Sequence, residues 1–178
     1  RVSASFAAVV EAPGDEGGQH IPSNLGAGIP IERAVLDSAL RIVALDADGT
    51  LDAPLPDDLP ADRDHWILLA PRESVLSPMF EHDWREAAAA RPDVGIFYGD
   101  DFAADEDRGR DQLRLKPAFD LTLLAAQDYI GAPLIVRASV LAELGLDAGA
   151  GAAVLDDLLL RAHHAGISIE RIPKVLLA

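Results

Sequence analysis

The sequence contains no cysteine, which excludes disulfide bonds, thiolate catalysis and cysteine-ligated zinc together. Positive charge is also scarce, because fifteen Lys and Arg stand against thirty Asp and Glu and leave a formal net charge of −15. A chain with this charge repels the phosphate backbone of a nucleic acid and an anionic membrane surface. We therefore expect no nucleic-acid partner.

Long apolar runs are missing as well. No stretch approaches the roughly 18 to 20 uncharged apolar residues of a membrane-spanning helix, and the run Phe6–Val10 is too short for the apolar core of a signal peptide. Of the 178 residues, 49% are apolar, which is enough for one compact unit with a sizeable core. We predict a single domain over residues 1–178 without a transmembrane segment, excised from a longer protein because the chain begins without Met.

Short apolar runs alternate with helix-like stretches, which predicts an α/β fold with a mixed sheet covered by helices. We expect strands at Phe6–Val10, Arg41–Leu45, Trp66–Leu69, Val94–Tyr98, Leu134–Arg137 and Ile167–Ile172. Capping residues and apolar spacing predict helices at Ile31–Leu40, from Ser77-Pro78 through Ala88, at Asp120–Gln127, at Ser139–Leu144 and at Asp156–Ala165.

One local motif, Asp46-Ala47-Asp48-Gly49-Thr50, directly follows the apolar run Ile42–Leu45. It resembles the first motif of haloacid-dehalogenase-type phosphatases, in which one Asp attacks phosphorus and the second protonates the leaving group. That chemistry needs a Lys between this motif and a later acidic motif, for which Asp100 would stand. Both lysines, Lys116 and Lys174, follow Asp100. An acidic turn after a strand is therefore the simpler interpretation, and a phosphatase is the third hypothesis.

A longer set of segments runs in order from His65 to Ala178. Its members are Trp66–Leu69, Leu76-Ser77-Pro78, Tyr98-Gly99-Asp100-Asp101, Leu115-Lys116-Pro117, Tyr129-Ile130-Gly131, Asp157-Leu158-Leu159-Leu160-Arg161 and Ile172-Pro173-Lys174-Val175-Leu176. In this order and spacing they resemble the inverting family 2 glycosyltransferases, especially the bacterial branch that builds O-antigen and other surface polysaccharides. The resemblance implies a GT-A nucleotide-diphospho-sugar transferase fold, a Rossmann-like α/β/α sandwich whose ligand lies outside the carboxyl ends of the strands.

The resemblance also implies the reaction, in which a sugar passes from a nucleotide-diphospho-sugar to a polysaccharide or lipid-linked acceptor. We expect it in the cytoplasm, at the inner face of the membrane if other parts of the full-length protein bind there. In the family an early strand ends in an acidic motif whose first Asp contacts the nucleotide base, and Asp46 with Asp48 matches that motif. Pro13 matches the loop after the opening strand. A non-catalytic binding module with the same fold is the alternative function.

Mg²⁺ or Mn²⁺ would normally hold the departing diphosphate through carboxylate oxygens. The family supplies these as Asp-x-Asp after a strand, where this chain has Pro71-Arg72-Glu73. The metal is therefore in doubt, with Glu73, Asp100 and Asp101 as its candidate ligands. Arg72 is either a phosphate contact or a surface ion-pair partner, and the two aspartates could equally form a solvated turn.

The catalytic base is displaced in a similar way. An inverting transferase uses a carboxylate to take the proton of the acceptor hydroxyl, and the family position for it holds Leu155 here. Asp156, one residue on, is the nearest substitute. Its other interpretation is an acidic residue favoured by the dipole at the start of a helix.

Overall fold

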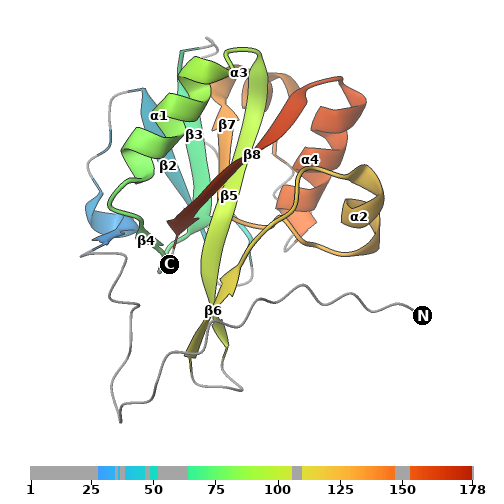
Figure 1. The fold of residues 1–178 in the computed structure, drawn as a ribbon. Coiled ribbons are helices and arrows are strands. Elements are labelled where there is room, and N and C mark those ends of the chain that lie inside the picture. Colours follow the sequence, from blue (N-terminus) through green and yellow to red (C-terminus); the bar gives the residue numbers. More distant parts are fainter. Residues whose placement is uncertain are drawn as a thin grey trace.

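The computed structural model describes residues 28–34, 36, 39–46, 49–51, 64–105, 110–146 and 153–177 (Figure 1). The predicted strand Phe6–Val10, together with Pro13 and Asp48, lies outside these described residues. None of the helices in the described part of the chain has the length and apolar character needed to span a lipid bilayer.

In the described part of the chain, eight strands form one mixed sheet in the order β1-β4-β8-β5-β7-β3-β2, with β6 paired to β5. Their bounds are Ile29–Pro30 for β1, Leu40–Leu45 for β2, Trp66–Pro71 for β3, Val75–Leu76 for β4, Val94–Asp105 for β5, Arg110–Arg114 for β6, Leu134–Arg137 for β7 and Ser168–Leu177 for β8. Strand β2 is parallel to β3 and β5 is parallel to β8, while β7 runs antiparallel to both β3 and β5. The carboxyl ends of β2, β3, β5 and β8 therefore meet at one edge, and the predicted mixed sheet is confirmed.

Helices cover both faces of this sheet (Figure 1). Helix α1, Phe80–Ala90, packs on one face with Trp66 and Phe97. Helices α3, Ala138–Leu144, and α4, Val154–His164, pack on the other with Ile96 and Tyr98. Successive strand residues point to opposite faces. Phe97 therefore packs in the core under α1, while Ile96 and Tyr98 pack in the core under α3 and α4. The α/β class is confirmed.

Capping residues explain three of the helix ends in the described part of the chain. Asp120 accepts a hydrogen bond from the Leu123 N–H at 2.8 Å and begins α2, Leu121–Ala126. Helix α3 ends at Gly145 with φ +70°, and Gly166 with φ +74° follows the end of α4. Both glycines adopt the left-handed backbone that other residues rarely tolerate.

The predicted helix Ile31–Leu40 is wrong. Among the described residues of this range only Ile31–Arg33 forms a 3-10 turn, Ala34 is extended, and Leu40 already begins β2. The Ile31 N–H donates to the Ser74 carbonyl at 3.1 Å, so this segment is bound to the start of β4. Tertiary pairing therefore overrides a helix-like pattern.

Two strands are longer than their apolar runs predict. Strand β5 does not stop at Tyr98 but continues through Asp100 and Asp101 to pair with β6, and β8 continues past Ile172 to Leu177. The interpretation of Asp100-Asp101 as a solvated turn is thus wrong, because both side chains are buried within β5.

Candidate functional site

The residues predicted on the donor side lie at the edge where β2 and β3 end. Leu45 is paired in register with Pro71, so Asp46 and Arg72 follow neighbouring strands. The Arg72 N–H donates to the Leu45 carbonyl at 2.9 Å and joins the two turns. The turns that hold Asp46 and Arg72 are therefore neighbours in the structure.

Asp46 occupies a tight turn. Its carbonyl accepts from the Gly49 N–H at 2.9 Å, its N–H donates to the Thr50 carbonyl at 2.8 Å, and Gly49 has φ +81°. The Thr50 hydroxyl donates to Asp46 Oδ2 at 3.3 Å, and the Asp46 side chain is otherwise exposed. The carboxylate is therefore held in place and accessible to a ligand that donates hydrogen bonds.

Arg72 and Glu73 are both exposed in the turn after β3. The Arg72 guanidinium lies 3.9 Å from a carboxylate oxygen of Glu32. An exposed ion pair of this length contributes little to stability, so Arg72 could exchange this partner for a phosphate at small cost. Glu73 is the one carboxylate in the segment Pro71-Arg72-Glu73.

Asp100 is enclosed by hydrogen-bond donors. The side chain is 2% exposed, and Arg171 binds it with both arms of its guanidinium, Nε to Oδ1 at 3.2 Å and Nη2 to Oδ2 at 2.6 Å. The Lys116 N–H donates to Oδ1 at 2.9 Å. Paired guanidinium bonds are the strongest arrangement a carboxylate finds in a protein, so Asp100 is firmly bound inside the chain.

Asp101, 3% exposed, has the same kind of partner. Arg114 of β6 donates to both of its oxygens, and the Lys116 ammonium lies 3.7 Å from Oδ2. Lys116 also donates to the Ala132 carbonyl at 2.5 Å, and burial lowers the pKa of its ammonium to about 8. A metal ion at Asp100 or Asp101 would have to displace a guanidinium group.

Asp156 lies in the first turn of α4. Helix α4 leads into β8, which begins beside the start of β5, so the first turn of α4 lies toward the edge where β5 ends. One carboxyl oxygen, Oδ1, is buried and accepts no hydrogen bond from any residue that the structure describes. Burial, followed by the negative charge and hydrogen bond of Asp128, raises the pKa of Asp156 to about 6. A carboxyl group with this pKa is suited to proton transfer near neutral pH.

The neighbouring Asp157 has a different function. Its carboxylate accepts from Arg161 one turn on, and Arg161 also donates to the carbonyls of Leu144 and Gly145. This links the end of α3 to α4, so Asp157 has a structural role. Adjacent positions on α4 thus hold one carboxylate bound by Arg161 and one whose Oδ1 accepts no hydrogen bond from the described residues.

Sequence inspection missed the residues that fix the loop before β7. Asp128 accepts from the Gly131 N–H at 3.0 Å. The Tyr129 hydroxyl accepts from the Asp120 N–H at 2.8 Å and donates to the Ala118 carbonyl at 3.3 Å, while the Tyr98 hydroxyl donates to the Pro117 carbonyl at 2.7 Å. Burial raises the pKa of both tyrosines, so both stay neutral donors. Only the Tyr-Ile-Gly motif signalled this loop.

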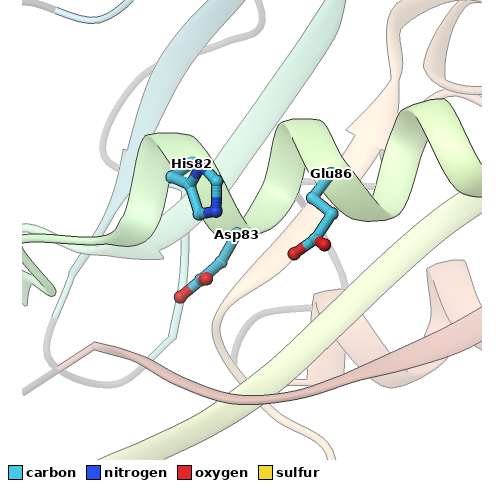
Figure 2. A group of neighbouring side chains, drawn as sticks. All are labelled: His82, Asp83 and Glu86. Carbon is cyan, nitrogen blue, oxygen red and sulfur yellow. The ribbon is translucent and has the colours of Figure 1, made fainter.

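A second group of polar side chains lies on α1, on the other face of the sheet from α4. Figure 2 shows His82 and Asp83 on one turn of α1 and Glu86 on the next. The atoms of these three side chains that could bind a metal ion all lie within 4.8 Å of one another. His82 and Glu86 are exposed along a groove whose wall includes the Glu81–Arg85 ion pair. The four-residue spacing of His82 and Glu86 is the signal that sequence inspection passed over.

Comparison with known proteins gives one informative similarity. No protein-family model matches the chain. The chain is similar to the O-antigen biosynthesis protein RfbC of Myxococcus xanthus, with 29% identity over 146 residues. The match covers 82% of this chain and 12% of that protein. The similarity is distant, and the name of that protein places it in O-antigen biosynthesis.

Proposed function

We propose that this chain is a glycosyltransferase-like domain that transfers a sugar from a nucleotide-diphospho-sugar to a polysaccharide or lipid-linked acceptor. The observation that carries the proposal is the placement of Asp46, Arg72 and Asp156. They come from three distant segments, and each lies toward the one sheet edge where ligands bind in α/β folds of this kind. The distant similarity to a protein of O-antigen biosynthesis supports the same conclusion.

Each of the three residues has a distinct role in the proposal. Asp46 accepts hydrogen bonds from the nucleotide base, and Arg72 binds the diphosphate. Asp156 takes the proton of the acceptor hydroxyl. The hydroxyl oxygen attacks the anomeric carbon, and the bond from that carbon to the diphosphate breaks. The proton ends on Asp156 and the negative charge leaves with the nucleoside diphosphate.

The cation that balances the diphosphate is a separate part of the proposal. Asp100 and Asp101 are already bound by Arg171 and Arg114, so the chain's carboxylates do not form a ready metal site there. We propose that Arg72 neutralises the diphosphate, with Glu73 as the ligand if Mg²⁺ or Mn²⁺ takes part. The setting we propose is the cytoplasmic side of the membrane, within a longer protein.

Calorimetry with UDP-, GDP- and dTDP-sugars, each with and without Mn²⁺, tests this function. We expect one donor to bind, and Asp46→Asn to weaken that binding about tenfold, the loss of about one charge-assisted hydrogen bond. Asp93→Asn is the matched control, because Asp93 is exposed before the start of β5, at the opposite edge. Absence of binding by every donor would reject the proposal.

The second candidate is a non-catalytic binding module of the same fold. It is favoured by Pro71-Arg72-Glu73 in place of two metal-binding aspartates and by the ion-paired state of Asp100 and Asp101. Donor binding without hydrolysis or transfer would identify the module. Phosphate release from p-nitrophenyl phosphate, abolished by Asp46→Asn, would instead identify a phosphatase.

A further inference from the structure

We infer that helix α1 carries a binding site for a divalent transition-metal ion such as Zn²⁺, with the imidazole of His82 and the carboxylates of Asp83 and Glu86 as its ligands. The inference goes beyond the proposed function, because none of these three residues takes part in the proposed reaction. Its consequence is a metal ion that stabilises α1 at the surface of the domain.

The helix brings the three ligand groups together. His82 and Glu86 are four residues apart and Asp83 and Glu86 are three apart, so both pairs are neighbours on the helix surface. The atoms that could bind an ion lie within 4.8 Å of one another (Figure 2). Ligand atoms at about 2.0 to 2.2 Å from a tetrahedral Zn²⁺ lie roughly 3.4 Å apart. Rotation of the partly exposed side chains covers the difference.

The backbone under these side chains is held by the core. Phe80, Trp84 and Ala87 are buried on the inner face of α1, and the Trp84 ring packs against a second buried indole with the centroids 6.2 Å apart. His82 and Glu86 project from the same turns and are exposed. Metal binding therefore orders three side chains without refolding the chain, and its entropy cost is limited to their rotamers.

The two carboxylates have no positive partner among the residues that the structure describes. The neighbouring cation, Arg85, binds Glu81 one turn back, with Nη2 at 2.7 Å from Oε1. Like charges on neighbouring positions of a helix repel each other, and the formal net charge of −15 adds to this repulsion. A divalent cation between Asp83 and Glu86 removes the repulsion, and the imidazole nitrogen of His82 provides the third ligand.

The imidazole decides which metal is favoured. Mg²⁺ and Ca²⁺ prefer sets of six or more oxygen ligands, whereas one imidazole with two carboxylates suits Zn²⁺, Co²⁺ and Ni²⁺. His82 and Glu86 line the groove along α1, so a fourth position on the ion opens to solvent and takes water. Within the described ranges of the chain, no second group of three such side chains occurs.

Calorimetric titration of the whole chain with ZnCl₂, without any sugar donor, tests the site. We expect one ion to bind, and His82→Gln and Glu86→Gln each to weaken the binding by about tenfold or more, because each removes a metal ligand. Two matched controls should leave the affinity for Zn²⁺ unchanged. Glu81→Gln removes a carboxylate of the same turn that is paired with Arg85, and His163→Gln removes an exposed imidazole on α4.

Thermal unfolding gives a second measurement of the same site. Zn²⁺ at a hundred times its Kd should raise the Tm of the unaltered chain and of both controls by roughly 5 °C. No binding of Zn²⁺, unchanged binding in His82→Gln, or an equal loss in Glu81→Gln would overturn the inference. Displacement of Zn²⁺ by an equal concentration of Mg²⁺ would overturn it as well, because it would identify a diffuse acidic surface in place of an imidazole-containing site.

Discussion

Asp100 and Asp156 both lie toward the same edge of the sheet, and their surroundings are opposite. Asp100 is 2% exposed and receives three hydrogen bonds, two of them from one guanidinium group. Asp156 is half-buried and has an oxygen that accepts no hydrogen bond from the described residues, and burial and the charge of Asp128 raise its pKa. One aspartate has its charge satisfied by the fold and the other does not.

The difference separates structural from chemical carboxylates. A buried charge that is fully paired holds elements together, here β5 with β8, and has little freedom to bind a ligand. A carboxyl group left short of partners titrates near neutral pH and can exchange protons with a substrate. In an acidic chain, the number of carboxylates is therefore a poor guide to a site, and their partners are a better one.

The largest expected effect on stability comes from removing Asp100, whose charge is fully paired. Asp100→Ala leaves Arg171 and the Lys116 N–H without their acceptor inside the protein, and we expect a loss of about 3 kcal/mol in the free energy of unfolding. Urea denaturation followed by circular dichroism measures it. Asp93→Ala, exposed before the same strand, should change the value by less than about 0.5 kcal/mol. Equal losses in the free energy of unfolding for Asp100→Ala and Asp93→Ala would contradict a structural role for Asp100.

A smaller effect on stability, which depends on pH, is expected at Asp156. The folded-state pKa of Asp156 is raised from 3.8 to about 6, so its contribution to stability is complete below pH 4 and is lost as the pH rises through 6. Asp156→Asn removes this loss. We expect the variant to match the unaltered chain at pH 3.5 and to exceed it at pH 8 by about 1 kcal/mol, a value reduced for solvent screening at a half-buried group.

The smallest effect on stability is expected at Arg72. Its contact with Glu32 is long and exposed, so Arg72→Met should change the free energy of unfolding by less than about 0.5 kcal/mol. The same substitution should weaken donor binding about tenfold if Arg72 binds the diphosphate. Thermal unfolding and calorimetry on one preparation separate the two, and a large loss of stability with unchanged binding would place Arg72 in the structural group.

The sequence predicts the sheet well where apolar runs are buried on both faces. Strand β7 has the predicted bounds, and β2 and β3 begin within one residue of theirs. The continuation of β5 through Asp100 could not be predicted, because its polar residues are stabilised by Arg114 and Arg171, far along the chain. Hydrophobic periodicity does not detect such pairing.

The candidate site was predictable in part for a similar reason. Asp46 and Arg72 each follow an apolar run that predicts a strand. The carboxyl ends of parallel strands lie at one edge of a sheet, so the proximity of these two residues follows from the sequence pattern. The raised pKa of Asp156 depends on its burial and on the charge of Asp128 in the loop before β7, and neither has a signature in the local sequence. The predictions for Pro13 and Asp48 stay predictions, since both lie outside the described residues.

The most direct test of the account compares one chemical change at two positions. Asp100→Asn and Asp156→Asn each replace a carboxylate by an amide, and their free energies of unfolding at pH 8 are measured by urea denaturation against the unaltered chain. We predict opposite signs, a loss of about 2 kcal/mol at Asp100 and a gain of about 1 kcal/mol at Asp156. Changes of the same sign would contradict the division of these carboxylates into structural and chemical groups.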